Sequence, residues 1–192
     1  MVEDTRVRLV AAGVAIVDEG GFRDVGVRAV AARVGISHGA PRRYFATLDA
    51  LLAAIAAEGV ADLDAVLRPA IEVGVGDAAV AYWRFANERP GMFELIFRHD
   101  VLDGAGGRLR ETTGTWFGAL ADQIGDVEQA LTCWSAVHGL CVLAATRVPD
   151  AVGVVVDEAT VRRVAERSTG VSTPLDQRRT RLDQRSGSGN SV

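Results

Sequence analysis

The chain has 192 residues, which is enough to bury a sizeable hydrophobic core in one or two domains. Its 48% apolar and 24% charged residues are an ordinary globular composition, and no apolar run approaches the roughly eighteen residues of a membrane span. The net charge of −4 excludes a protein that coats nucleic acid over its whole surface, but it is compatible with a small basic patch.

The first part of the chain predicts a short helical domain. Apolar residues repeat at helical spacing over about Thr5–Glu19, and two glycines follow. A second helix is expected over about Val27–Val34, after which Gly35 can adopt the left-handed conformation of a sharp turn. Ser37 is a suitable N-cap for a third helix.

The third helix is expected to present two different faces. Pro41 and Phe45 share one face and should point inward, which places Pro41 near the first turn, where proline is tolerated. The opposite face should expose His38, Gly39, Arg42 and Arg43.

The rest of the chain predicts further helices and no convincing strand. Thr47 should cap a fourth helix that has Pro69 near its end, and Gly74–Gly76 should interrupt the chain. Later helices are expected over about Asp77–Arg89, from Pro90, over Arg108–Ile124, Val127–Arg147 and Asp157–Arg167, with a glycine-rich loop at Gly104, Gly106 and Gly107. The fold class is therefore all-α. Residues 168–192 hold too few apolar side chains to bury and are expected to be a flexible tail.

The segment around Gly35 predicts a helix-turn-helix. A small residue stands at Ala31, where the two helices would cross closely, and no Asp or Glu occurs between Val25 and Leu48. The second helix of such a pair lays its first residues against base edges in the major groove, where arginine can hold phosphate or guanine. The alternative is a buried helical hairpin with a solvated basic face, although such a face usually mixes both signs of charge.

The stretch RAVAARVGISHGAPRRYFATLDALLAAI resembles the DNA-binding head of TetR-type transcriptional regulators, over about Arg6–Ile55. A second stretch, over about Ala79–Arg147, resembles the C-terminal domain of the TetR subgroup named for its Trp, His and Gly. AYWRFANERPGMFELIF and the segment from Trp134 to His138 and Gly139 carry that second resemblance.

The resemblance implies a helix-turn-helix DNA-binding domain over residues 1–55, with the motif at about 27–45, and a helical ligand-binding and dimerisation domain over residues 56–167. It implies a homodimer that binds a near-palindromic operator and is released by a small-molecule effector. The residues that it assigns to DNA are Arg28, Ser37, His38, Gly39, Ala40, Arg42, Arg43 and Tyr44. Two positions depart from the family, since Arg42 replaces a usual tyrosine and Leu48 stands where many members have a backbone-binding lysine.

Aromatic residues are concentrated after Asp77, and they support two interpretations. They can form the hydrophobic core, or they can line a pocket for an apolar ligand. The expected lining residues are Trp83, Phe97, Trp116 and Phe117.

Trp134 and His138 lie four residues apart on one helix face, and the resemblance assigns them, with Gly139, to the fold or the subunit interface. Cys133 and Cys141 are expected to be small buried fillers. No catalytic residue, metal site or cofactor is expected, because Cys133 and His138 point to different faces and no strand precedes the glycines at Gly74 and Gly76.

The sequence thus predicts a ligand-responsive DNA-binding transcriptional regulator, a repressor rather than an activator, and not an enzyme. The acidic N-terminus lacks the basic region of a signal peptide, so a cytoplasmic location without a membrane partner is expected. The alternative is a helical small-molecule carrier or enzyme with a degenerate DNA-binding head.

Overall fold

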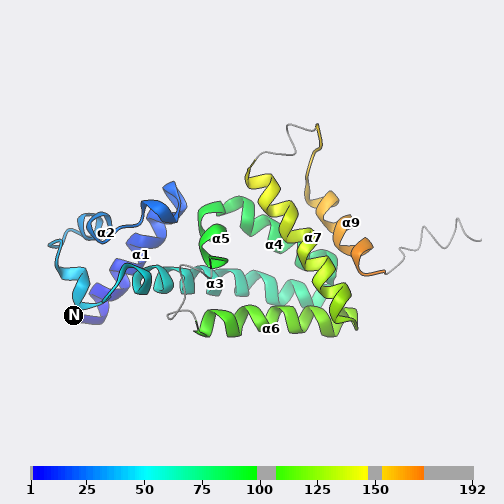
Figure 1. The fold of residues 1–192 in the computed structure, drawn as a ribbon, viewed down its shortest axis with the longest axis horizontal. Helices are drawn as coiled ribbons and strands as arrows, with labels where there is room; N and C mark the ends of the chain where they lie inside the picture. Colours follow the sequence, from blue (N-terminus) through cyan, green and yellow to red (C-terminus); the bar gives the residue numbers. More distant parts are fainter. Residues whose placement is uncertain (1, 99–106, 147–152, 171–192) are drawn as a thin grey trace, which may run out of the picture.

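The computed structural model describes residues 2–98, 107–146 and 153–170, and the regular elements within these ranges are all helical (Figure 1). This confirms the all-α prediction. The α-helices are α1 (Val2–Gly20), α2 (Val27–Val34), α3 (Leu48–Val73), α4 (Val75–Glu88), α5 (Pro90–Ile96), α6 (Gly107–Ile124), α7 (Val127–Ala145) and α9 (Glu158–Ser168), and two 3-10 helices are η1 (Phe22–Asp24) and η2 (Ala40–Arg43). Most of the expected tail and the loop glycines Gly104 and Gly106 lie outside the described residues.

The N-terminal helices pack around a small apolar core. Leu9 and Val17 of α1 are fully buried, as are Val30 of α2 and Ile55 of α3. Gly13 of α1 leaves no room for a Cβ beside Ile55, so α1 and α3 approach each other closely. Of the apolar residues that repeat along α1, Val10 and Val17 are buried, whereas Val7 is 58% exposed.

A single long helix, α3, joins the head to the rest of the molecule (Figure 1). Its first turn is capped as expected, because the Thr47 hydroxyl accepts a hydrogen bond from the Ala50 amide at 3.0 Å. It continues past Pro69 and ends where Gly74 breaks the helix. The expected domain boundary between residues 55 and 56 therefore lies inside a continuous helix.

The C-terminal part is a bundle in which α6 runs alongside α3, while α4, α7 and α9 pack on one another (Figure 1). The short helix α5 fills the space between the bundle and the head. Its buried side chains are Met92, Phe93, Leu95 and Ile96.

The head and the bundle meet at the junction of α4 and α5. The Arg89 guanidinium donates to both carboxylate oxygens of Asp18 in α1, at 3.0 and 2.9 Å, and to Asp62 in α3 at 2.6 Å. At Gly91, a Cβ would collide with the backbone carbonyl of Val17 in α1. The start of α5 is therefore held directly against the end of α1.

Candidate functional site

The expected turn between the helices of the motif is present. Gly35 adopts a left-handed conformation with φ of 77°, and its amide and that of Ile36 donate to carbonyls at the end of α2. A left-handed φ is costly for residues with a Cβ, so glycine is the suitable residue here. The guanidinium of Arg8 also donates to the Val34 carbonyl at 3.0 Å, which ties α1 to the end of α2.

The third helix differs from the sequence prediction. Instead of a regular α-helix capped by Ser37, the chain forms a turn at residues 38 and 39 and then the 3-10 helix η2, whose N-cap is Gly39 without a side-chain hydrogen bond. Pro41 has no amide hydrogen and disfavours the α conformation of the residue before it, and Gly39 is a weak helix former. These two residues explain why the recognition element is a short, tight helix.

The two faces of this element are nevertheless the expected ones. Pro41 and Phe45 are buried. The exposed residues among those assigned to DNA are Arg28, Ser37, His38, Gly39, Arg42 and Arg43, while Ala40 and Tyr44 are half-buried. The structure thus places the predicted DNA-binding residues on two elements that contact each other, the start of α2 and the segment that ends in η2.

The basic character of this surface depends on which arginines are already paired. Arg33 makes a bidentate ion pair with Glu19 of α1, at 2.5 and 2.6 Å, so its charge is largely neutralised. Arg28, Arg42 and Arg43 form no ion pair with any residue in the described ranges. Sequence reasoning missed Arg6, whose guanidinium lies 5.2 Å from the centre of the Phe45 ring and extends the positive surface from α1.

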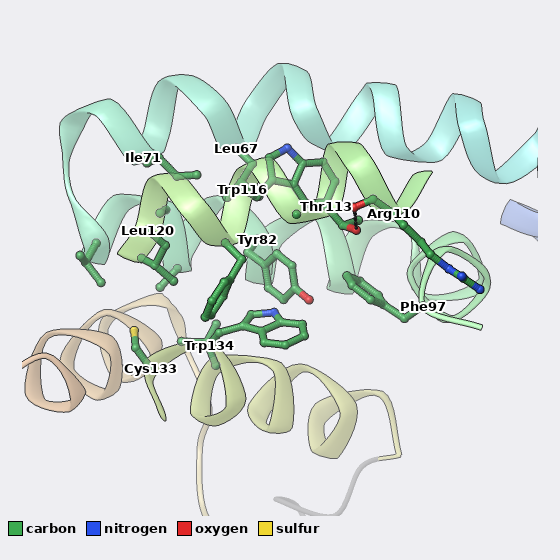
Figure 2. A pocket seen from close by; sticks show the side chains of 16 residues that line it. Leu67, Ile71, Tyr82, Phe97, Arg110, Thr113, Trp116, Leu120, Cys133 and Trp134 are labelled. Carbon is green, nitrogen blue, oxygen red and sulfur yellow. Dashed lines mark hydrogen bonds between the residues drawn. The ribbon is translucent and has the colours of Figure 1, made fainter. Parts of the chain in front are cut away.

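A cavity of about 530 Å³ lies inside the C-terminal bundle (Figure 2). This volume is in the usual range for small-molecule sites. The residues that line it are Leu67, Ile71, Val75, Ala78, Ala79, Tyr82, Phe97, Arg110, Thr113, Gly114, Trp116, Phe117, Leu120, Cys133, Trp134 and Val137. They come from α3, α4, α6 and α7 and from the residue that follows α5.

Three of the four expected lining residues, Phe97, Trp116 and Phe117, are in this wall. Trp83 is not, because α4 turns the face of Ala79 and Tyr82 toward the cavity and Trp83 lies about 100° further around the helix. Its Nε1 is buried without a hydrogen-bond partner in the described part of the chain.

Trp116 is held by a polar contact on the outer side of the wall. Its indole Nε1 donates to the Asp64 carboxylate of α3 at 2.7 Å, and Arg68 donates to the same carboxylate at 2.7 Å. The hydrogen bond from Trp116 lowers the pKa of Asp64, and Arg68 adds to this effect. The indole ring of Trp116 is therefore fixed in one orientation.

His138 contacts the cavity wall through Tyr82. The Tyr82 hydroxyl lies 2.8 Å from Nδ1 of His138, and the imidazole packs within 4.9 Å of the Phe97 ring centre and 5.9 Å of the Trp134 ring centre. Burial lowers the pKa of His138 and raises that of Tyr82 well above its ordinary value. Both groups are therefore neutral near pH 7, and Tyr82 can donate to the imidazole.

Two residues have roles that the sequence did not reveal. Trp134, which the resemblance assigns to the fold or the interface, also lines the cavity, and Tyr82 connects the cavity to His138. Gly139 is half-buried in α7, and a Cβ there would meet no atom within 4 Å.

The cysteines show no activated thiol. Burial raises the pKa of Cys133 to about 11 and that of Cys141 to about 12, so both are protonated near pH 7. The described residues contain no cluster of three or more His, Cys, Asp or Glu side chains that could hold a metal ion. In the same ranges, no helix is both long enough and apolar enough to cross a bilayer.

Solved structures share this architecture. The chain is similar to a proposed transcriptional regulator from Pseudomonas aeruginosa PAO1, with a TM-score of 0.65 and 18% identity over 88% of this chain and 90% of that chain. It is similar to the multidrug binding protein EbrR complexed with ethidium, with a TM-score of 0.63 and 22% identity over 85% of this chain and 96% of that chain. A TetR transcriptional regulator from Rhodococcus sp. RHA1 gives a TM-score of 0.55 and 18% identity over 88% and 97% of the two chains. At these identities the likeness concerns the fold.

Family models match both parts of the sequence, whereas no curated protein gives a significant match. Residues 9–55 match the bacterial regulatory proteins of the tetR family, and residues 75–166 match the tetracyclin repressor-like C-terminal domain. The first match covers the helix-turn-helix and the second covers most of the cavity wall. The chain therefore belongs to the TetR family of transcriptional regulators.

Proposed function

We propose that this regulator is a repressor that binds a near-palindromic operator as a homodimer and is released when a small, largely apolar effector enters the cavity. The observation that carries the proposal is the exposed basic surface of Arg28, Arg42 and Arg43 around the Gly35 turn. Paired arginines would be poor DNA ligands, but these three have no ion-pair partner in the described ranges.

The route from the cavity to the head runs through α5. Phe97 follows the last residue of α5 and lines the cavity, whereas Arg89 and Gly91 hold the start of α5 against α1. An effector that displaces Phe97 would therefore shift α5 relative to α1. The effector needs only to bind the arrangement that cannot bind DNA more tightly than the arrangement that can. A coupling free energy of about 1–3 kcal/mol between effector binding and DNA binding would be typical.

The two-fold assembly is proposed to form through α7 and α9, which pack on each other. Along α7, Val127, Leu131, Trp134 and Val142 recur at helical spacing and are 63%, 49%, 38% and 45% exposed. An apolar stripe of this kind is suited to a four-helix contact between two subunits. Dimerisation would place two recognition elements on successive major grooves, about 34 Å apart.

We also infer that the C-terminal domain belongs to the subgroup named for Trp, His and Gly. Trp134, His138 and Gly139 fall within residues 75–166, which match the tetracyclin repressor-like domain, and the Trp134 and His138 rings pack together. The aromatic contacts around His138 support a structural role for this histidine.

The DNA-binding proposal can be tested by selecting bound duplexes from a random library and measuring their affinity in gel shifts. We expect a near-palindrome, bound less tightly as salt rises from about 50 to 200 mM because phosphate contacts release counterions. Replacing both Arg42 and Arg43 with Ala should abolish retention. The matched control replaces Arg23 of η1 and Arg68 of α3 with Ala, which removes the same charge outside both the reading surface and the proposed interface. Equal retention by the two double variants would show that the reading surface is elsewhere.

The second candidate function is that of a small-molecule carrier, or an enzyme, with a degenerate head, and the cavity is the observation that favours it. Such a protein would bind ligand but would select no DNA sequence from the library. If the protein selects an operator, and if a cavity ligand then releases that operator in the gel shift, the result favours the regulator over the carrier or enzyme. We expect this regulator to act in the cytoplasm and to lack enzymatic activity.

A further inference from the structure

Three polar groups in the cavity wall, those of Tyr82, Trp116 and Thr113, are already engaged with protein atoms. The Tyr82 hydroxyl is bonded to His138 at 2.8 Å, and the Trp116 indole N–H is bonded to Asp64. The Thr113 hydroxyl is 3.0 and 3.1 Å from the carbonyls of two preceding residues in α6. Polar groups of a ligand buried among these residues would therefore lack donors, which is costly in an apolar site.

The same wall offers a large aromatic surface. Tyr82, Phe97, Trp116, Phe117 and Trp134 all line the cavity, and the Phe117 and Trp134 rings meet edge to face with centroids 6.1 Å apart. Aromatic walls of this kind favour flat, apolar ligands. The body of the ligand should therefore be hydrophobic, with its polar group at an edge of the cavity.

One edge of the cavity carries a charge. Arg110, in the first turn of α6, lies beside Phe97, and its guanidinium extends away from the other rings toward the outside (Figure 2). It is exposed and has five N–H donors, so it can hold an anionic group in addition to its protein partner. Its place near the N-terminus of α6 adds the favourable end of the helix dipole.

We propose that the cavity takes an apolar acid, a molecule with a flat hydrophobic body and a single carboxylate or similar anionic group. The body lies among the five aromatic rings and the anionic group is held by Arg110. This inference rests on the proposed role of the cavity as the effector site, and it adds the chemical class of the effector.

The test uses three molecules of the same shape and different charge: naphthoate, naphthalenemethanol and protonated naphthylmethylamine. Their affinities for the full chain are measured by isothermal titration calorimetry at pH 7. We expect naphthoate to bind about three- to tenfold more tightly than the alcohol, since a partly exposed charge pair has a modest effect. The amine should bind most weakly. The advantage of naphthoate should shrink as salt rises.

Variants at Arg110 assign this preference to its side chain. Arg110→Gln should reduce the affinity for naphthoate to that for the alcohol, whereas Arg110→Lys should retain part of the preference. Arg23→Gln removes an equivalent charge from η1, outside the cavity and the proposed interface, and should leave all three affinities unchanged. The affinity for naphthalenemethanol should be the same in every variant, which shows that the cavity is intact.

The outcomes separate this inference from the proposed function. If the alcohol binds in the cavity but naphthoate gains nothing, if the amine binds best, or if the preference persists in Arg110→Gln, the acid assignment is overturned and the effector cavity stands. If none of the three molecules binds, both the acid assignment and the effector role of the cavity are contradicted.

Discussion

Gly114 and Gly118 of α6 provide a matched pair of positions for testing the cavity. A Cβ at either glycine would meet no atom within 4 Å, but Gly114 lines the cavity and Gly118 does not. Gly114→Leu should therefore place an isobutyl group in the space that a ligand needs, whereas Gly118→Leu should place the same group outside it. Neither substitution requires a backbone change.

Both variants should be more stable than the parent protein, because glycine inside a helix costs about 0.8–1.0 kcal/mol relative to good helix formers. The melting temperature should rise by about 2–4 °C for a chain of this size. Forcing a ligand into an overfilled site costs about 1–3 kcal/mol, so Gly114→Leu should weaken ligand binding by roughly 5- to 150-fold. Gly118→Leu should leave ligand binding unchanged.

Calorimetry with naphthalenemethanol measures binding, and scanning calorimetry measures the melting temperature. Because naphthalenemethanol is uncharged, the result does not depend on Arg110. Equal affinities in Gly114→Leu and Gly118→Leu would refute the assignment of the ligand site to this cavity. A marked loss of stability confined to Gly114→Leu would refute the reasoning that its Cβ faces open space.

Three further predictions concern stability and assembly. Trp116→Phe removes the N–H donor from Asp64 and should cost about 1–2 kcal/mol at pH 7. The pKa of Asp64 in the folded state lies below its ordinary value of 3.8, so the stability difference between Trp116→Phe and the parent should shrink as the pH falls below 3.8. Urea titrations from pH 7 to pH 3 measure this difference. Burial lowers the pKa of His138, so its contribution to stability should decline as the pH falls below about 6.5; His138→Gln should lose that part of the pH dependence, and an unchanged profile would contradict it. Leu131→Glu should convert the dimer to monomer in light scattering, whereas Val73→Glu, at a 74% exposed position on α3, should not; a dimeric Leu131→Glu protein would exclude the α7 interface.

Several local features follow from the sequence alone, because they depend on residues close together in the chain. Thr47 caps α3 through an amide three residues away, and Gly35 supplies the left-handed turn after α2. The buried positions of Pro41 and Phe45 were predicted from helical spacing, although the same residues do not form a regular helix. The family resemblance of the head rests on this local pattern.

Tertiary structure decided which side chains act together. Arg33 lies in the basic window of the sequence, but the packing of α2 on α1 pairs it with Glu19 and leaves the proposed DNA-binding surface to other arginines. Helical phase alone could not show that Tyr82 rather than Trp83 faces the cavity, because that depends on where α6 and α7 lie around α4. Spacing along the chain determines which face a residue occupies, whereas the identity of its neighbours depends on contacts between segments far apart in sequence.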